Sequence, residues 1–543
     1  MQYLWIADIS GIQSYIFSTY LLKTIVGASE LLVKATDKEI LQKELKAYPD
    51  SQLLSNRGGN LVCRFEKEED CKQFTAWFLS RLADLAPGVH CAIAWEEANK
   101  NLQPTEIFQR CREKVQNAKS KAIALGNEPS DAYPIYSPPS WNFFRLCGIC
   151  GSNPVIGKVS KAENDGKIKT YHLCSACHAK WQQADKRDTT AMHQLEEHFI
   201  AALKSLATKP NDDTDLVKAA SQDELVWKNI KFAYKNIVPR IIKPDSKDDM
   251  DSINPYIAAV AIDGNYMGKW FDQKLQGENF DEVCSQFAKA SAELEENSHK
   301  AITLGLAQAL HRQQLPKDED GAYFLPFRPI IMAGDDLFFL VDAKYVFTIV
   351  SVFLDKMKET FPDISFAIGI AIVKESFPFH ASYSLAKELV TSAKNKTRAE
   401  SCIDFELNRD HSLMPLSLRR KERELKGYTL TRRPFTITKF QSMETNSQLL
   451  QKLPGNKRKH LYEMLANFDQ SNLSIDDIQE ELREFFVHLE KEQAKSLWQF
   501  LEKQHEKPVS AKEDPFYIPD MFANYSTLVL DCLDYLDIIA KAE

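Results

Sequence analysis

The sequence predicts an α+β protein of several domains, built on two ferredoxin-like βαββαβ units. Two observations support this prediction: the same order of strand and helix patterns occurs twice, and in both places a short apolar strand pattern ends in an aspartate. A third observation is length. The 543 residues are several times one typical domain of about 100 to 200 residues, so we expect roughly three to five compact units.

The first unit, assigned to residues 1–140, opens with a short apolar run that ends at Asp8. Short apolar runs bounded by turn residues predict strands, and apolar residues that recur every three to four positions predict helices. On this basis the unit continues with a helical stretch over 12–45, a strand over 52–55, a turn at 57–60, a strand over 61–65, a helix over 69–85 and a strand over 89–95.

The second unit, assigned to residues 256–435, repeats this plan. Its first strand ends at Asp263, and a glycine-containing turn joins its second and third strands, as in the first unit. The predicted elements are a strand over 257–264, a helix over 281–312, strands over 329–332 and 337–341, a helix over 345–360 and a strand over 365–373. We interpret the repeat as an internal duplication.

Three further segments accompany the two units. Residues 141–185 contain two cysteine pairs and are predicted to form a small metal-binding module. Residues 186–255 are predicted to be a helical connector that ends in an exposed, charged linker over 243–249. The pattern over 436–543 predicts a C-terminal helical bundle; its leucine and aromatic positions are interpreted as that bundle's core, with a partner-binding face as the alternative.

Composition limits the classes of function. Hydrophobic residues make up 44% and charged residues 27%, which is typical of folded globular proteins. A formal net charge of -8 argues against a protein that binds nucleic acid over its whole surface, so any contact with RNA has to be local. No run approaches the roughly 18 apolar residues of a membrane span, and the start lacks a signal peptide. We therefore expect a cytoplasmic protein without membrane contact.

The strongest chemical signal is a set of three aspartates in the second unit. Asp263 ends the first strand, and Asp335 and Asp336 lie in the turn between the next two strands, which are central neighbours in a βαββαβ sheet. Oxygen ligands without histidine or cysteine suit Mg²⁺ or Mn²⁺, and two such ions can activate a ribose 3′-hydroxyl and hold a triphosphate. The alternative is a solvated hairpin, because aspartate is common in turns.

Two more residues would support such a site. Gly334 would allow the backbone to turn tightly before the aspartates. Lys394, near the end of a helix that follows the fourth strand, could direct its charge at a phosphate, although an ordinary surface position explains it equally well.

The two cysteine pairs are the second strong signal. In each pair two residues separate the cysteines, and 23 residues lie between the pairs. This spacing predicts a structural Zn²⁺ site with four thiolate ligands and no open position; free thiols paired by chance are the alternative. The predicted ligands are Cys147, Cys150, Cys174 and Cys177. His172 and His178 lie beside the pairs and could replace a ligand, while the other seven of the 11 cysteines are scattered, which fits a reducing compartment.

A basic run over 419–426, followed by Arg432 and Arg433, is the clearest candidate for contact with RNA or phosphate. Glu422 and Glu424 are interleaved with it, so an exposed helix with internal ion pairs is the favoured interpretation. Both interpretations place the run at the surface.

Taken in order, the motifs resemble those of one known family. The segments that carry the resemblance are 8–17 (Asp-Ile-Ser-Gly-Ile-Gln-Ser-Tyr-Ile-Phe), 262–269 (Ile-Asp-Gly-Asn-Tyr-Met-Gly-Lys), 333–336 (Ala-Gly-Asp-Asp), 369–373 (Gly-Ile-Ala-Ile-Val), 386–389 (Ala-Lys-Glu-Leu) and 393–394 (Ala-Lys). With the cysteine pairs between the two copies, the chain resembles the large, polymerase-like palm subunit of type III CRISPR effector complexes, which is related to GGDEF nucleotide cyclases. The resemblance covers nearly the whole chain.

The resemblance implies two cyclase-like palm domains that face each other, with two ATP molecules between them and catalysis by the second domain. The implied catalytic metal site consists of Asp263, Asp335 and Asp336, with Ile262 beside them. The implied nucleotide-binding residues of this domain are Gly264, Gly334 and Lys394. Two departures from the family are Ala333, where a second glycine is usual, and Asn265, which replaces a frequent aspartate and could alter the preference for base or metal.

In the first domain, Asp8 matches Asp263, but the turn at 57–60 has no acidic pair. The resemblance therefore implies that the first domain shapes the pocket of the acceptor nucleotide and does not catalyse. Asp8, Ser10 and Gly11 would lie against that nucleotide.

The leading hypothesis is an RNA-activated nucleotidyltransferase that converts ATP into cyclic oligoadenylate, in a complex with other type III subunits, a crRNA and a target RNA. One alternative from the same family joins AMP to S-adenosylmethionine. A second is a scaffold subunit with a relict site, and a third is a free-standing cyclase that uses GTP. Many family members begin with an HD nuclease domain, but none of the 12 histidines here is followed by aspartate, so we expect no DNA nuclease activity.

Overall fold

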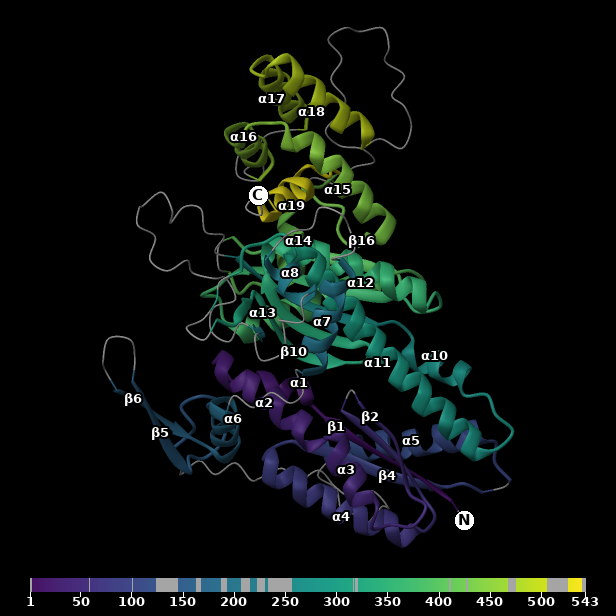
Figure 1. The fold of residues 1–543 in the computed structure, drawn as a ribbon. Coiled ribbons are helices and arrows are strands. Elements are labelled where there is room, and N and C mark those ends of the chain that lie inside the picture. The colour runs from purple at the N-terminus through teal and green to yellow at the C-terminus, as the bar shows by residue number, and fades with distance from the viewer. Residues whose placement is uncertain are drawn as a thin grey trace.

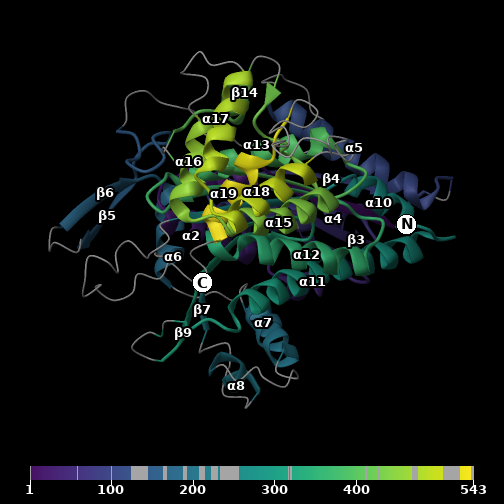
Figure 2. The ribbon, with the colours of Figure 1, turned by 90° about the horizontal axis from the view of Figure 1, so that it is seen from above.

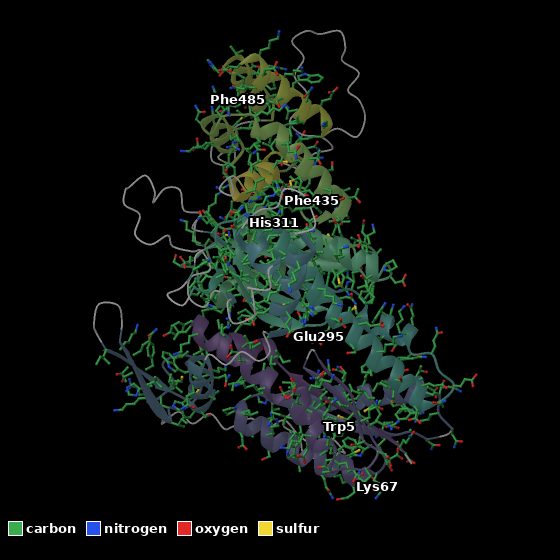
Figure 3. All side chains as sticks on the ribbon, in the orientation of Figure 1. Trp5, Lys67, Glu295, His311, Phe435 and Phe485 are labelled. Atoms are coloured by element: carbon green, nitrogen blue, oxygen red, sulfur yellow. The ribbon has the colours of Figure 1, made fainter. Side chains whose placement is uncertain are left out.

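The ribbon in Figure 1 shows a computed structural model of the chain. It describes residues 2–57, 59–99, 101–123, 145–162, 168–186, 193–206, 215–221, 230–232, 256–315, 317, 321–409, 412–425, 428–466, 475–504 and 526–539. Two sheets covered by helices form the body of the molecule. Trp5 of the first sheet and Phe485 of the C-terminal helices lie toward its two ends (Figure 3).

The first sheet has four strands in the order β2-β3-β1-β4. These strands are β1 (Tyr3–Ser10), β2 (Gln52–Arg57), β3 (Asn60–Phe65) and β4 (His90–Glu97). Its helices are α1 (Ile12–Phe17), α2 (Leu22–Ala35), α3 (Lys38–Leu45), α4 (Glu68–Leu85) and, after β4, α5 (Pro104–Ile123). The predicted order of elements is observed, but the helical stretch expected over 12–45 is divided into three helices. Asp37 contributes to this division, because its side chain caps α3 by accepting a bond from the Ile40 amide at 3.0 Å.

The second sheet continues beyond the four strands that the sequence predicts. Its order is β10-β11-β8-β12-β13-β16, with β12 and β13 parallel. The strands are β8 (Tyr256–Gly264), β10 (Phe327–Ala333), β11 (Asp336–Asp342), β12 (Phe366–Lys374), β13 (Cys402–Leu407) and β16 (Phe435–Thr436). The connecting helices are α10 (Met267–Lys274), α11 (Phe280–Leu310), the 3-10 turn η3 (Ala343–Tyr345), α12 (Val346–Thr360) and α13 (Phe379–Lys396).

Both faces of the second sheet are buried. Along β8, Ala258, Val260 and Ile262 enter the core formed with α11 and α12, while Ile257, Ala259 and Ala261 enter a second core formed with α13 and the helices of the first sheet. Successive side chains of a strand point to opposite faces, so a strand that is buried on both sides becomes continuously apolar. This explains the uninterrupted apolar run that ends at Asp263.

Helix α11 is shared by the two sheets. Val283 and Phe287, near its start, pack with α5 under the face of the first sheet that presents Leu4 and Ile6. Farther along, α11 packs on α12 beneath the second sheet. Figures 1 and 2 show this helix running from one sheet to the other.

Strand β13 was not predicted, because its sequence alternates apolar residues with Asp404 and Glu406. Such alternation suggests one solvated face. All six residues of β13 are nevertheless buried. The two carboxylates are paired with arginines from the basic run, so the polar face of the strand is covered by opposite charge.

The expectation that the basic run lies exposed at the surface is wrong for its arginines, while Lys421 is exposed. Arg420 pairs with Asp404 at 2.6 Å, Arg423 pairs with Glu406 at 3.3 Å, and Arg419 is only 8% exposed. Arg433 is fully buried and pairs with Asp531 and Asp534 of the last helix at 2.8 and 2.7 Å. These ion pairs join the arginines to carboxylates far away in the sequence, so a pattern within one helix could not reveal them.

The cysteine-bearing segment forms a hairpin followed by a helix, beside α2 (Figure 1). Its elements are β5 (Gly157–Ala162), β6 (Ile168–Leu173) and α6 (Ser175–Lys186). In the connector the described elements are α7 (His193–Leu206), α8 (Asp215–Ser221) and a short strand β7 (Ile230–Phe232), which pairs in parallel with β9 (Tyr323–Leu325). The charged linker expected over 243–249 lies outside the described residues.

The end of the chain is helical, as the sequence predicts. The helices are α15 (Ile437–Gln451), α16 (Gly455–Ala466), α17 (Ile475–Val487), α18 (Lys491–Lys503) and α19 (Val529–Ile539). Before them lie α14 (Leu416–Glu422), β14 (Glu424–Leu425) and β15 (Tyr428–Thr429). The buried apolar side chains of α15 to α19 belong to the same cluster as one face of the second sheet. Among the described residues no helix has the length and apolar character of a membrane span.

Candidate functional site

The strand register brings the three aspartates of the second sheet together. Leu337 of β11 lies opposite Ile262 of β8, so the next position along the ladder places Asp336 across from Asp263. The Cβ of Asp335 lies 2.9 Å from the point that a Cβ on Gly264 would occupy. The three carboxylates therefore gather at one end of the central strands.

Two lysines of α13 face these carboxylates. Lys394 Nζ donates to Asp263 Oδ1 at 2.5 Å, and Lys387 Nζ donates to Asp336 Oδ1 at 3.1 Å. The lysines lie seven positions apart in the sequence, which places them two turns apart on the same face of the helix. Lys394 is thus not an idle surface residue, and it contacts the cluster directly.

The surroundings of Asp335 favour its neutral form. Burial, and after it the charge of Asp263, raises the pKa of Asp335 to about 7. Two lysines against three carboxylates leave one negative charge without a partner, and protonation of Asp335 removes that charge. A divalent cation bound at the cluster would reverse the effect by favouring the charged carboxylate.

Backbone conformation sets the shape of this end of the sheet. Gly334 has a φ of +63°, a left-handed conformation that glycine adopts without strain, so the tight turn requires glycine there. Ile262 is fully buried and lies between Leu337 and Ile368 of the neighbouring strands. Its side chain offers no ligand atom, so only its backbone carbonyl could contribute to a metal site.

Asn265 supports the turn after Asp263. It is 5% exposed; its amide Nδ2 donates to Ser365 Oγ at 3.0 Å and its backbone N–H to the Ser365 carbonyl at 2.8 Å. This amide tethers β8 to the start of β12. Tyr266, the next residue, is half exposed, and its ring lies 5.6 Å from the Arg398 guanidinium.

The corresponding end of the first sheet carries a reduced version of this arrangement. Asp8 lies opposite Asn60, where the second sheet places Asp336 opposite Asp263. Lys119 of α5 forms an ion pair with Asp8, and Ser10 Oγ donates to the Asp8 carbonyl at 3.4 Å. Gly11 begins α1 with a φ of +67°. The first sheet therefore has one carboxylate and one lysine at the position where the second sheet has three carboxylates and two lysines.

The two ends are joined by Gln13 of α1, whose Nε2 donates to Asp336 Oδ2 at 3.1 Å. Gln13 and Lys387 belong to the motifs that carry the family resemblance, but sequence reasoning gave neither a role; the seven-residue spacing of Lys387 and Lys394 was the available signal. Lys119 was missed as well. It lies 111 residues from Asp8, and no local pattern marks it.

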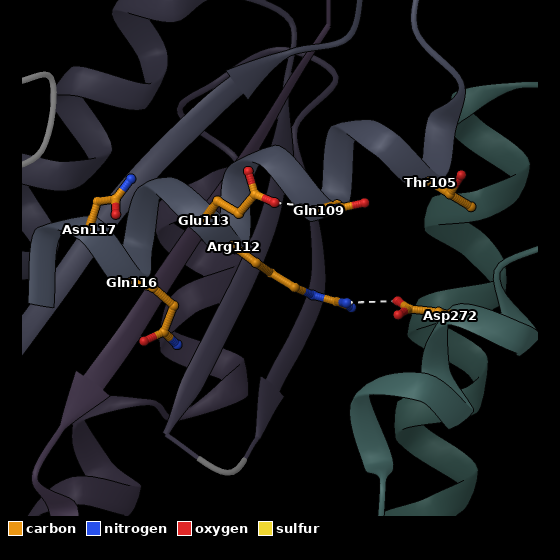
Figure 4. A pocket seen from close by; sticks show the side chains of 7 residues that line it. All are labelled: Thr105, Gln109, Arg112, Glu113, Gln116, Asn117 and Asp272. Carbon is orange, nitrogen blue, oxygen red and sulfur yellow. Dashed lines mark hydrogen bonds and ion pairs between the residues drawn. The ribbon is translucent and has the colours of Figure 1, made fainter.

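A polar cleft lies between α5 and α10. Its volume is about 670 Å³, and Figure 4 shows Arg112 and Asp272 forming an ion pair across it at 2.9 Å. Asp272 is its one lining residue from α10, and none of the three clustered aspartates lines it. The cleft is therefore separate from the carboxylate cluster.

The four cysteines of the two pairs converge. Their Sγ atoms all lie within 4.8 Å of one another. The backbone N–H groups of Ile149 and Cys177 donate to Cys147 Sγ and Cys174 Sγ, each at 3.5 Å, which is typical of metal-binding knuckles. The His178 ring instead lies 3.5 Å from Gln182 Nε2. The donor set fits a tetrahedral Zn²⁺ ion and needs no histidine.

Cys174→Ser is expected to remove the zinc. The wild-type chain should contain one ion, and the variant only a small fraction of one, because three thiolates bind Zn²⁺ far more weakly than four. Metal content of the purified chain, measured by plasma mass spectrometry, tests this. His178→Ala should keep its zinc, and loss of zinc from His178→Ala would contradict the four-cysteine assignment.

Gly264→Ala is expected to disturb the carboxylate cluster. The added Cβ would lie 2.7 Å from Met267 Sδ and 2.9 Å from Asp335 Cβ, so the turn that carries Asp335 has to shift. We expect Mn²⁺ affinity, measured by electron paramagnetic resonance (EPR) titration, to fall about tenfold, since metal sites demand accurate ligand geometry. Gly268→Ala is the matched control, because a Cβ there meets nothing within 4 Å. Equal Mn²⁺ affinities in the two variants would contradict this prediction.

Comparison with known proteins agrees with this geometry. Residues 256–402 match the family model for Cas10/Cmr2, second palm domain. These residues contain the three aspartates and both lysines of the cluster. No curated protein matches the chain in sequence.

Several solved structures share the fold. Csm1 in T. onnurineus is 14% identical with a TM-score of 0.53. A Csm1-Csm4 cassette in complex with pppApApA is 13% identical with a TM-score of 0.53, and one in complex with AMPPNP is 13% identical with a TM-score of 0.51. Each match covers 100% of this chain and 69% of the solved chain. At this identity the likeness shows a common fold.

Proposed function

We propose a nucleotidyltransferase function, from the premise that this chain belongs to the Cas10/Cmr2 family of large palm subunits in type III CRISPR complexes. The proposed reaction joins ATP molecules to form a cyclic oligoadenylate messenger when target RNA is bound. Each new phosphodiester bond forms as the bond between the α- and β-phosphates breaks, and pyrophosphate leaves. The single observation that carries the proposal is the cluster of Asp263, Asp335 and Asp336, faced by Lys387 and Lys394.

The donor set suits the metal ions that this chemistry uses. Three carboxylates without nitrogen or sulfur ligands fit Mg²⁺ or Mn²⁺, which would supply Lewis acidity for an attack by a 3′-hydroxyl on an α-phosphate. Asp263 and Asp336 hold their positions through their lysine partners. With cations held by the carboxylates, Lys387 and Lys394 would be able to bind triphosphate oxygens as point charges. Gly264 and Gly334 would keep the backbone close to the nucleotide.

The first palm would hold the acceptor. Its Asp8 is occupied by Lys119 and lies opposite Asn60, so it lacks the acidic pair that two metal ions require. Asp8, Ser10 and Gly11 would instead contact the acceptor nucleotide. In this proposal residues 1–140 and 256–435 are duplicated palm domains, 141–185 a zinc module, 186–255 a connector and 436–543 a helical domain.

The proposed setting is a cytoplasmic complex with other type III subunits, a crRNA and a target RNA. Some of the solved relatives are Csm1-Csm4 cassettes, which supports partnership with another subunit. RNA contact would come mostly through those partners, because the net charge is -8 and three arginines of the basic run, Arg420, Arg423 and Arg433, are committed to internal ion pairs.

The alternative messenger is AMP joined to S-adenosylmethionine. This reaction would use the same metal site and release pyrophosphate from ATP in the same way, and it would differ only in the acceptor. A non-catalytic scaffold is the other alternative. The intact ring of three carboxylates and two lysines favours catalysis, since the first sheet shows what a reduced site looks like.

The experiment is product analysis of the complex loaded with crRNA and target RNA. It is incubated with Mg²⁺ or Mn²⁺ and ATP, with and without S-adenosylmethionine, and analysed by mass spectrometry. Oligoadenylate made from ATP alone would support the proposal. A methionine-linked AMP that needs both substrates would select the alternative acceptor, and no product from a target-bound complex would favour the scaffold.

A further inference from the structure

A buried lysine lies between the cysteine cluster and the first palm. Lys180 of α6 is 1% exposed; its Nζ donates to the Tyr15 carbonyl at 2.5 Å and to Ser18 Oγ at 2.9 Å, and it lies 3.8 Å from the centroid of the Tyr15 ring. These partners, from α1 and its C-cap, carry no charge. Burial lowers the pKa of Lys180 to about 8. A buried ammonium of this kind needs a compensating anion nearby.

The cysteine cluster can supply that anion. Cys177 lies three residues before Lys180 on α6, which places the two on the same face of the helix. Four thiolates around one Zn²⁺ carry a net charge of about -2, so the loaded cluster is an anion. A loaded zinc centre would therefore hold Lys180 in its charged form, with its bonds to α1 intact.

The backbone of α6 fixes where Lys180 lies. The helix passes so close to α2 that a Cβ on Gly27 would be 1.9 Å from the Lys180 carbonyl oxygen. Figure 1 shows α6 against α2. Lys180 thus reaches α1 from a rigid support.

The other side of α1 contacts the carboxylate cluster. Gln13 donates to Asp336, and Phe17, one turn later, stacks on Tyr383 of α13 with ring centroids 3.8 Å apart. Phe17 also meets Phe338 of β11 edge-on at 5.2 Å. A shift of α1 would disturb the hydrogen bond from Gln13 to Asp336. It would also move the Phe17 ring, which packs against α13, the helix of both lysines, and against β11, the strand that begins with Asp336.

We propose that Lys180 is a positioning residue that couples the zinc-thiolate centre to the metal-binding carboxylates through α1. This inference rests on the proposed function in one respect, namely that Asp336 binds a divalent cation. It gives the zinc module a role beyond local stability. Loss of the Lys180 charge should loosen α1 and weaken the carboxylate site, although Lys180 touches neither metal.

The test uses full-length Lys180→Met, which keeps the length of the side chain and removes its charge. Three quantities are measured without nucleotide: zinc content, hydrogen exchange of the amides over 12–18, and Mn²⁺ affinity by EPR. We expect zinc content to stay at one ion, exchange over 12–18 to accelerate about tenfold, and Mn²⁺ affinity to fall five- to tenfold. Lys158→Met, an exposed lysine in the same module, should change none of the three.

Two further variants keep the test decisive if Lys180→Met does not fold. Ser18→Ala removes one acceptor of Lys180 and should accelerate exchange over 12–18 by a smaller factor. Gln13→Ala removes the last link and should weaken Mn²⁺ binding with unchanged zinc content. Normal Mn²⁺ affinity in both Lys180→Met and Gln13→Ala would overturn the proposal, as would loss of zinc from Lys180→Met.

Failure of the synthase proposal gives a different result. A wild-type chain that binds Mn²⁺ at a site sensitive to Asp336→Asn, but makes no product in its complex, contradicts catalysis alone. The coupling would then still be judged by exchange and Mn²⁺ affinity. A wild-type chain with no such Mn²⁺ site overturns the coupling itself.

Discussion

Asp336→Asn is expected to lower product formation at least about 1,000-fold, which corresponds to about 4 kcal/mol of lost transition-state stabilisation. Asp336 lies next to the Leu337–Ile262 pair that ends the ladder, and it receives hydrogen bonds from Lys387 and Gln13. The substitution keeps the shape of the side chain but removes the negative charge that would attract a cation, and it breaks the ion pair with Lys387. The rate of product formation is measured in the target-bound complex.

Asp363→Asn is the matched control for this experiment. Asp363 is exposed and precedes β12 in the same palm, outside the cluster. Its activity should equal that of the wild type. Activity of Asp336→Asn within tenfold of the control would contradict a catalytic role for the three carboxylates and would favour an ordinary solvated hairpin.

Arg433→Met is expected to destabilise the junction between β13 and α19 by about 3–5 kcal/mol, because it removes the ion pair of the buried Asp531 and one of the ion pairs of the buried Asp534. Arg433 is fully buried and pairs with Asp531 and Asp534. Burial raises the pKa of Asp534, but Arg433, Arg423 and Arg409 outweigh burial and hold that pKa at about 2. Without Arg433 a buried charge remains that the protein has to neutralise or expose.

The measurement is thermal unfolding of the full chain, followed by hydrogen exchange over β13 and α19 to locate the change. Arg483→Met removes an arginine from an exposed pair with Glu480 and should alter stability by less than about 0.5 kcal/mol. Equal shifts for Arg433→Met and Arg483→Met would mean that the buried network does not hold the helices to the sheet.

The strands of both sheets that lead to the carboxylates could be predicted from the sequence, because each is a short apolar run bounded by turn residues. The run ending at Asp263 is apolar throughout and bounded by a glycine, so it could only be a buried strand. The turn at Asp335 and Asp336 followed from Gly334. These features depend on residues that are close together in the sequence, so a local sequence pattern is enough to predict them.

The errors and omissions are of another kind. Strand β13 was missed because Asp404 and Glu406 resemble a solvated face, and the basic run was misassigned for the complementary reason. The burial of each segment is explained only by its contact with the other, and the paired residues lie 14 or more positions apart in the sequence. Contacts between distant segments were also missed, because the periodicity of a sequence does not show them. Examples are Lys119 with Asp8 and Gln13 with Asp336.

The sharing of α11 between the two sheets restricts how the molecule can move. Its 31 residues form a helix about 46 Å long. The first turns pack under one sheet, and the later turns pack under the other. A hinge motion that separated the two sheets would have to expose apolar surface at both ends of α11, or bend the helix. Relative movement of the two sheets is therefore expected to proceed by small sliding movements along α11, which would shift the carboxylates by only a fraction of a helical turn.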